Sequence, residues 1–183
     1  MMNNKLNKLF SVIAVSTGLA ISGITLNSES AKAQEQVKFV CAPSFDQQTN
    51  QQLPTTFAWT SRGKIAIVRW ETTAFKNYSP QTRCEKVSPR FQEAYENGGI
   101  NFLMNGQMNQ QPVICTAQES GGECDTLLMT LRKNDNPIPI LTQLQEVLNG
   151  RQVGAVRHSS NVPQLYYQVD FENFLRTAPV ESE

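Results

Sequence analysis

The feature that most limits the fold is a set of four cysteines, Cys41, Cys84, Cys115 and Cys124. Four cysteines allow three disulfide pairings. The last two flank the segment TAQESGGE, whose glycine pair at 121–122 favours a turn. A local loop of this kind is easy to close. We therefore expect one bridge between Cys115 and Cys124, and a second bridge between Cys41 and Cys84.

Two other uses of the cysteines are weighed against disulfides. Zinc sites need clustered ligands such as paired C-x-x-C motifs, but the chain has no C-x-x-C and a single histidine, His158. A Cys–His nucleophile would need His158 and one free thiol, which an oxidising compartment disfavours. His158 lies in VRHSSN, a segment typical of a solvated loop. We expect Cys84 to be a structural half-cystine, and we expect neither a metal nor a cofactor.

The first residues indicate export. Lys5 and Lys8 precede an uncharged and mostly apolar segment at 9–24, and Ala31-Lys32-Ala33 forms a small-x-small cleavage site. These are the three parts of a secretory signal peptide. A membrane anchor is the alternative, but a spanning helix needs roughly 20 predominantly apolar residues, and polar residues interrupt this segment. We predict a signal peptide at 1–33 and a mature chain that begins at Gln34.

The mature chain of 150 residues is long enough for one ordinary domain. Three of the 16 basic and one of the 16 acidic residues lie in the leader, so the mature chain keeps 13 basic and 15 acidic residues, a net charge of −2. It contains no basic run, which argues against nucleic acid as a partner. No later segment is apolar enough to span a bilayer, so membrane association would be peripheral at most.

Hydrophobic patterning predicts strands and helices in alternation. Strands are expected at 36–41, 55–60, 64–70, 100–104, 112–117 and 125–131, and helices at 80–88, 89–97, 139–150 and in the second half of 162–177. Loops are expected at 44–54 and at Asn105-Gly106, and a hairpin turn at 61–63. This order predicts an α+β fold with an antiparallel sheet of about five or six strands. A kinked helix and a second helix would pack on one face of that sheet. We expect a single domain at 34–178 and a disordered tail at 179–183.

The first predicted helix carries two prolines at a spacing of nine residues. Ser79-Pro80 is a good helix start, since serine caps and proline fits the first turn. Ser88-Pro89 repeats the pair, and a proline inside a helix removes a hydrogen bond and clashes with the preceding turn. We therefore predict two helical pieces that meet at a kink or break. Their inward face would hold Cys84, Val87, Phe91, Ala94 and Tyr95.

Several short motifs occur here in a specific order. They are PTT (54–56), RW (69–70), RCEKVSPRFQ (83–92), PVIC (112–115) and CDTLLMTL (124–131). Together they resemble the cyanobacterial circadian-oscillating-protein domain family over about 37–150. The resemblance implies a cyanobacterial host, an exported protein and a four-cysteine pattern. It implies no assigned activity and no catalytic residue. Export in such a host leads to the periplasm, the exterior or the thylakoid lumen.

Arginines near aromatic residues form the candidate ligand site, which comprises Arg69, Trp70, Arg83 and Arg90. Arg69 lies inside an apolar strand, where a buried charge must be paired. One interpretation is an internal ion-pair network that uses Glu71 or Glu85. The other is an anion or sugar-acid site, with Trp70 or Trp59 as a stacking wall.

Catalytic motifs are absent from the sequence, which contains no G-x-S-x-G, H-E-x-x-H, P-loop or dinucleotide fingerprint. We expect an exported, disulfide-stapled, non-enzymatic protein that binds a ligand or associates with the envelope. Its partner would be an envelope component or a small anionic ligand. The alternative is an envelope-directed hydrolase that uses a free thiol or paired carboxylates. The carboxylate candidates are Glu71, Glu85, Glu93, Asp125 and Asp170.

Overall fold

The computed structural model describes residues 36–71, 77–149 and 164–181, all within one compact unit, Gln34–Glu183. The predicted signal peptide and His158 lie outside the described residues. The elements run in the order β1 (Lys38–Asp46), β2 (Gln51–Thr60), β3 (Gly63–Arg69), α1 (Pro80–Glu96), β4 (Phe102–Met108), β5 (Gln111–Ala117), β6 (Leu127–Thr130), α2 (Pro137–Leu148), β7 (Tyr166–Gln168) and α3 (Phe171–Thr177).

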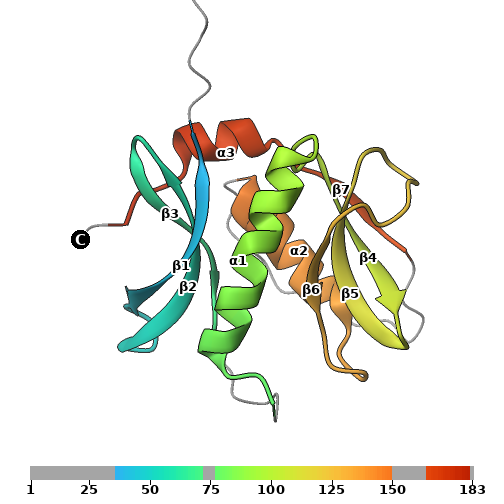
Figure 1. The fold of residues 1–183 in the computed structure, drawn as a ribbon, viewed down its shortest axis with the longest axis horizontal. Helices are drawn as coiled ribbons and strands as arrows, with labels where there is room; N and C mark the ends of the chain where they lie inside the picture. Colours follow the sequence, from blue (N-terminus) through green and yellow to red (C-terminus); the bar gives the residue numbers. More distant parts are fainter. Residues whose placement is uncertain (1–35, 72–76, 150–163, 182–183) are drawn as a thin grey trace, which may run out of the picture. The chain divides into compact units, whose positions relative to one another are not determined.

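The α+β class and the antiparallel pairing are confirmed, but the strands divide between two sheets. One sheet has the order β1-β2-β3 and the other the order β6-β5-β4-β7. Helix α1 contacts β1, β2 and β6, while α2 contacts β3, β4, β5 and β7. The two long helices therefore pack against strands of both sheets (Figure 1) instead of covering one face of a single sheet.

The first sheet begins with a hairpin that the sequence analysis placed partly in a loop. The Gln-rich segment 44–54 belongs mostly to β1 and β2, and Pro43 lies opposite Pro54. The turn is tight because Asp46 accepts hydrogen bonds from the backbone and the hydroxyl of Thr49, and because Asn50 adopts a φ of 53°. Polar composition misled the prediction, since pairing with a neighbour sets strand structure more than intrinsic propensity does.

The turn expected at Asn105-Gly106 is also displaced. Both residues lie inside β4, and the chain reverses at Asn109 and Gln110, which have φ values of 48° and 61°. A two-residue hairpin loop of type I′ has positive φ at both central residues. Asn105 is buried, and its side-chain oxygen accepts the N–H of Leu165 at 2.7 Å, just before β7. That bond helps β7, a strand that the sequence analysis did not predict, to pair with β4.

Helix α1 is one continuous element with Pro89 inside it, so of the predicted kink or break the break is absent. Ser79 caps the helix by accepting the N–H of Thr82, and Pro80 fills the first turn, as predicted. Ser88, the residue before the proline, donates its hydroxyl hydrogen to the carbonyl of Cys84 at 2.9 Å. Most of the predicted inward face is buried, namely Cys84, Val87, Phe91 and Ala94. We infer that packing on both sides of Pro89 holds the helix together.

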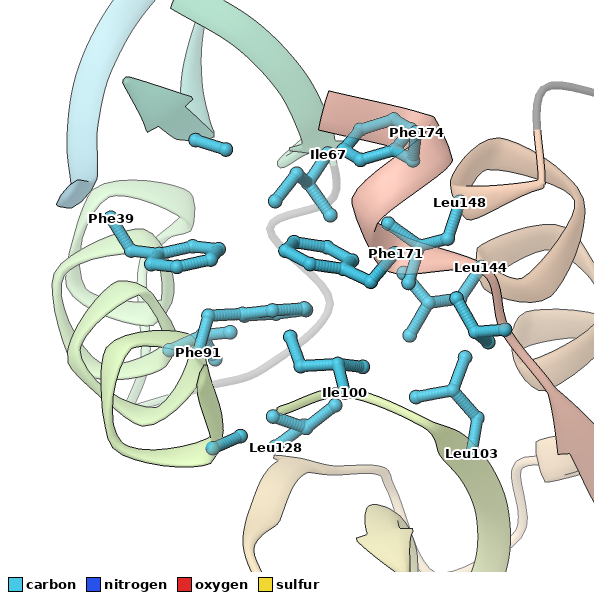
Figure 2. Close-up of a cluster of buried hydrophobic side chains, with 14 of the residues drawn as sticks. Phe39, Ile67, Phe91, Ile100, Leu103, Leu128, Leu144, Leu148, Phe171 and Phe174 are labelled. Atoms are coloured by element: carbon cyan, nitrogen blue, oxygen red, sulfur yellow. The ribbon is translucent and has the colours of Figure 1, made fainter. Parts of the chain in front are cut away.

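Stacked aromatic rings fill the core between α1, β1 and α3 (Figure 2). The ring of Phe39 stacks on Phe91 and on Phe171, each at 5.9 Å between centroids. Phe174 continues the cluster at 5.5 Å from Phe171. Helix α3 thus covers this part of the core, and the residues that follow it return to the first sheet, where Glu181 bonds to Lys64.

Candidate functional site

The structure forms both disulfides in the predicted pairing. Cys41 in β1 joins Cys84 in α1, with 5.5 Å between their Cα atoms, and Cys115 joins Cys124 at 5.4 Å. These are all four cysteines of the chain, so none offers a free thiol. The first bridge ties the opening strand to the helix that follows the first sheet, which fixes how α1 packs on β1 and β2.

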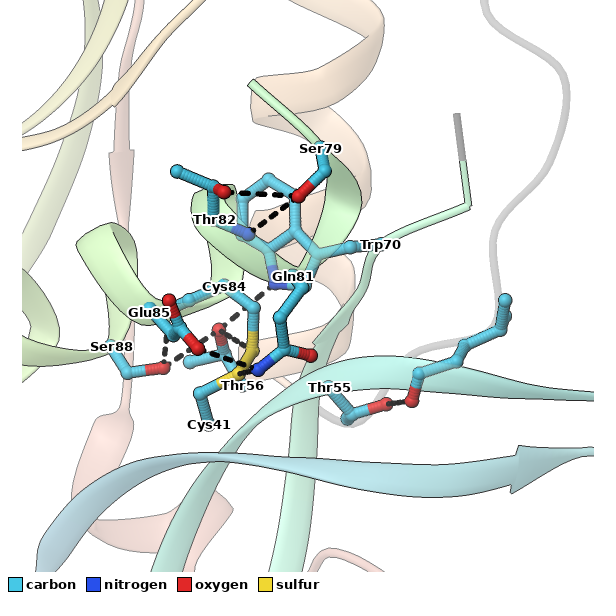
Figure 3. The surroundings of a disulfide bond; sticks show 11 residues. Cys41, Thr55, Thr56, Trp70, Ser79, Gln81, Thr82, Cys84, Glu85 and Ser88 are labelled. Carbon is cyan, nitrogen blue, oxygen red and sulfur yellow. Dashed lines mark hydrogen bonds between the residues drawn. A yellow bond between two sulfur atoms is a disulfide. The ribbon is translucent and has the colours of Figure 1, made fainter. Parts of the chain in front are cut away.

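Thr56 organises the polar contacts around this bridge (Figure 3). Its hydroxyl accepts the indole N–H of Trp70 at 3.1 Å and the hydroxyl of Ser88 at 3.1 Å. It also lies 3.9 Å from the sulfur of Cys84. Each of these residues belongs to one of the short motifs PTT, RW and RCEKVSPRFQ. These three motifs are therefore adjacent in space, and Thr56 fixes the indole N–H of Trp70.

A cleft of about 1140 Å³ opens between β3 and α2, and we call it the β3–α2 cleft. One wall is β3 with Trp70, and the other is the α2 stripe of Ile140, Gln143, Leu144 and Val147. The β1–β2 turn forms one end, and Val180 and Glu181 line the cleft as well.

Arg69 lies in the cleft and is paired, but not with the predicted partners. Its guanidinium contacts Asp46 at 3.5 Å and forms a short hydrogen-bonded ion pair with Glu181. Its side chain is 29% exposed, so the charge is only partly desolvated. The predicted partners Glu71 and Glu85 are wrong, and Glu85 accepts a hydrogen bond from Gln81 instead. Glu71 was a candidate from the same strand and Glu85 a candidate from the helix, whereas the hairpin and the C-terminal tail supply the observed partners.

The carboxylate of Asp46 has a lowered pKa. The largest causes are the hydrogen bonds from the hydroxyl and the backbone N–H of Thr49, which outweigh the opposing effect of burial. The positive charge of Arg69 lowers the pKa further. Asp46 therefore stays ionised at neutral pH and places a negative charge beside Arg69.

Arg83 and Trp70 form the second charged feature of the cleft. The guanidinium carbon of Arg83 lies 4.6 Å from the centre of the Trp70 ring, in a cation–π arrangement. Trp70 is only 3% exposed, and its N–H is already bound to Thr56. Burial lowers the pKa of Arg83, and the nearby Asp135 partly offsets this effect. A guanidinium that is partly desolvated on a fixed aromatic surface interacts more strongly with an anion than an exposed one does.

Two residues of the predicted constellation do not reach the cleft. Arg90 donates to the carbonyl of Leu128 at 3.3 Å and is not among the cleft residues. Trp59, the alternative stacking wall, is 48% exposed and lies under the ammonium of Lys64 at 5.2 Å. The site therefore assembles Arg69, Trp70 and Arg83, without Arg90 or Trp59.

The C-terminal tail, Pro179–Glu181, is the part of the site that the sequence analysis missed. Of the tail that was expected to be disordered, 179–183, residues 182–183 lie outside the described residues, whereas the N–H of Glu181 donates to the carbonyl of Lys64 at 2.8 Å. One oxygen of its carboxylate accepts from Ser44 at 2.9 Å, and the other pairs with Arg69. Arg62 fixes the chain just before the tail by donating to the carbonyls of Leu175 and Ala178 at 2.7 and 3.1 Å. These tertiary bonds replace the solvation that a free tail would have.

Charges in the cleft are balanced while the tail is bound. The basic lining residues are Lys64, Arg69 and Arg83, and the acidic ones are Asp46, Glu71 and Glu181. Among the described residues, no group of three or more His, Cys, Asp or Glu side chains could hold a metal ion. Nor does any helix in the described part of the chain have the length and apolar character that crossing a membrane requires.

The family model for circadian oscillating protein COP23 matches residues 38–176, from the start of β1 into α3. The chain belongs to the COP23 family. This match includes the motifs on which the resemblance rested and extends past them to β7 and most of α3. Val180 and Glu181 lie beyond the part that the COP23 model covers. No curated protein and no solved structure matches the chain.

Proposed function

We propose that this member of the COP23 family is an exported, non-enzymatic binding protein. Its ligand is an acidic component of the cell envelope, held in the β3–α2 cleft. Export is supported by the signal-peptide pattern at 1–33 and by the two disulfides, which persist in oxidising compartments. The compartment is the periplasm, the exterior or the thylakoid lumen of a cyanobacterium.

The observation that carries this proposal is the presence of two guanidinium groups in one cleft. Arg83 lies against the Trp70 ring, and Arg69 already holds a carboxylate, that of Glu181. Guanidinium groups suit carboxylates because their planar fork of donors matches the two oxygens. Trp70 is buried against Arg83, so its ring fixes that guanidinium in the cleft.

The charge balance also favours an acidic ligand. Glu181 is the one acidic lining residue that lies on the tail, whereas Asp46 and Glu71 lie on or next to strands of the first sheet. When the tail leaves, three basic residues face two acidic ones, and the cleft gains a net positive charge. An incoming carboxylate restores the balance and takes the place of Glu181 on Arg69.

A hydrolase is the weaker alternative. Asp46 and Glu181 contact the same guanidinium, so two carboxylates do lie near each other. Carboxylate hydrolysis, however, needs one acid with a raised pKa that can donate a proton. The pKa of Asp46 is lowered, so this acid stays ionised and lacks the proton that such a mechanism must donate. The thiol version lacks a nucleophile, since all four cysteines are bonded.

The test is a pull-down from cyanobacterial envelope extract with the disulfide-intact mature protein. Arg83→Gln removes the charge on the cleft side of α1, and Arg176→Gln, on the exposed surface of α3, is the matched control. The proposal expects an acidic envelope component that the mature protein and Arg176→Gln retain and that Arg83→Gln loses. Equal retention by all three proteins, or retention of nothing, would contradict it.

A further inference from the structure

We propose that the ligand of the β3–α2 cleft is an extended acidic peptide that adds as a strand to the free edge of β3. This inference rests on the proposed function and deepens it, because it names the chemical class of the ligand and its mode of binding. The chain's own tail, Pro179–Glu181, occupies one end of the same site and shows how such a peptide is held.

Within the described part of the chain, no strand pairs with the outer edge of β3. β3 is an outer strand in the order β1-β2-β3, so one row of its backbone groups faces away from the sheet. The carbonyl of Lys64 belongs to this outward-facing row, since it accepts the N–H of Glu181. Backbone groups in a strand alternate with a period of two, which places those of Ala66 on the same edge. Lys64 and Ala66 both line the cleft.

Helix α2 supplies the facing wall. Ile140, Leu144 and Val147 follow helical spacing, and all three line the cleft. Gln143 lies between them, is exposed, and can hydrogen-bond to a peptide backbone. A groove between an edge strand and a helix is the arrangement in which peptides bind by β-augmentation. Main-chain bonds then give affinity, and alternate side chains enter pockets.

The acid preference comes from the tail. Glu181 uses its backbone N–H on Lys64 and its carboxylate on Arg69 and Ser44, so a single residue makes both strand-like and charged contacts. The cleft measures about 1140 Å³ with Val180 and Glu181 as lining residues. Pockets for small ligands are commonly about 300–1,000 Å³. This volume is the space left in the cleft while the tail is bound, and it suits several peptide residues along β3 and α2.

A partner peptide competes with the tail. A short tether gives the tail an effective concentration of roughly millimolar, so the tail weakens binding of an acidic peptide without preventing it. Replacing the Glu181 carboxylate by an amide loosens the tail and leaves Arg69 for the incoming acid. The same replacement in the peptide removes the acid from the ligand side.

The experiment follows backbone amide signals of the ¹⁵N-labelled mature protein by nuclear magnetic resonance. The probe is the heptapeptide Thr-Ala-Pro-Val-Glu-Ser-Glu, and the control peptide has glutamine at both acidic positions. We expect the acidic peptide to cause saturable shifts of the amide signals of Ala66 and Gln143. The control peptide should bind about tenfold more weakly. The acidic peptide should bind more tightly to Glu181→Gln than to the natural chain. Glu172→Gln, on the exposed face of α3, should bind like the natural chain.

A blocking variant keeps the test independent of Arg69, whose loss would also affect folding. Gln143→Trp places bulk in the cleft from an exposed position and should abolish the shifts at Ala66 while the rest of the spectrum is preserved. Absent shifts, equal binding of both peptides, or binding that Gln143→Trp leaves unchanged would overturn the inference. If the envelope pull-down still depends on Arg83 but yields a glycan, the proposed function stands and the peptide inference fails. If neither experiment depends on the cleft, both fail.

Discussion

Arg69 in β3 binds the carboxylate of Glu181, which lies 112 residues further along the chain. The same guanidinium faces Asp46 from the β1–β2 hairpin. One arginine thus connects the first hairpin, the edge strand and the C-terminal tail at the mouth of the cleft. Fold stability and the ionisation of Asp46 are therefore linked at this arginine.

Removing Arg69 should therefore destabilise the fold. Arg69→Ala leaves the carboxylates of Asp46 and Glu181 without their shared cation, and we expect the free energy of unfolding to fall by more than it does for Arg62→Ala. Arg62→Ala loses two hydrogen bonds to carbonyls at the end of α3, and the expected cost is about 1 kcal/mol. Urea unfolding of both variants measures the difference. A larger loss for Arg62→Ala would mean that the tail matters through α3 and not through Arg69.

Gly63 should tolerate no side chain while the tail is docked. Its φ is +128°, and an added Cβ would lie 2.3 Å from a methyl carbon of Val180. We expect Gly63→Ala to cost about 1–3 kcal/mol from backbone strain, with a further loss from displacement of Val180. Gly121→Ala is the control, since Gly121 also has positive φ but its added Cβ would meet nothing within 4 Å.

The contact part of that loss can be isolated with a double variant. In the Val180→Ala background, thermal melting should show a smaller penalty for Gly63→Ala, close to that of Gly121→Ala. An unchanged penalty would show that Val180 does not pack on Gly63 in solution.

The two disulfides should differ in their effect on stability. Cys41–Cys84 spans 43 residues and Cys115–Cys124 spans 9, for which the chain-entropy model gives about 4 and about 3 kcal/mol. Cys84 also lies in the fully buried face of α1. We expect the double Ser variant of the first pair to unfold at lower urea concentration than that of the second. Peptide mapping without reduction checks the pairing, and a peptide that joins Cys41 to Cys115 would refute it.

Acid should weaken the fold partly through Asp46. The pKa of Asp46 is lower in the folded protein than its ordinary value of about 3.9. Below that value the unfolded state binds the proton more readily than the folded state. The stability that Asp46 contributes is therefore present above pH 4 and is lost as the pH falls through the lowered folded pKa. Melting temperatures from pH 6 to pH 2 should fall less steeply for Asp46→Asn than for the natural chain. Parallel curves would contradict this coupling.

The leader prediction has a direct test. Mass spectrometry of the protein recovered from its host should give a mature N-terminus at Gln34, because Ala31 and Ala33 occupy the small positions of the cleavage site. A mature protein that retains residues 5–24 would instead support an anchor.

Local signals in the sequence predicted much of the fold. Ser79-Pro80 set the start of α1, and the apolar spacing from Cys84 to Ala94 gave its buried face. The glycine at 63 identified the β2–β3 hairpin. The predictions that failed were those in which a distant partner decides the outcome. Pro89 is accepted inside a helix that is packed and bridged, and Asn105 is held in β4 by Leu165, 60 residues away.

The candidate site was half predictable for the same reason. Arg69, Trp70 and Arg83 stand out because a charged or aromatic residue interrupts an apolar pattern, and the structure places all three in one cleft. Arg90 lies on the same helix as Arg83, but its side chain reaches the carbonyl of Leu128. Nothing local marks Glu181 as a partner of Arg69, since a short acidic terminus is typical of a solvated tail. Only the course of the chain after α3 brings the two residues together.

Hydrogen exchange of the mature protein, with and without cyanobacterial envelope extract, tests the central claim most directly. If the β3–α2 cleft is the binding site, amides of β3 and of the facing side of α2 should exchange more slowly with extract present, while those of β5 in the second sheet should not change. Equal exchange throughout, or protection confined to the second sheet, would contradict the account.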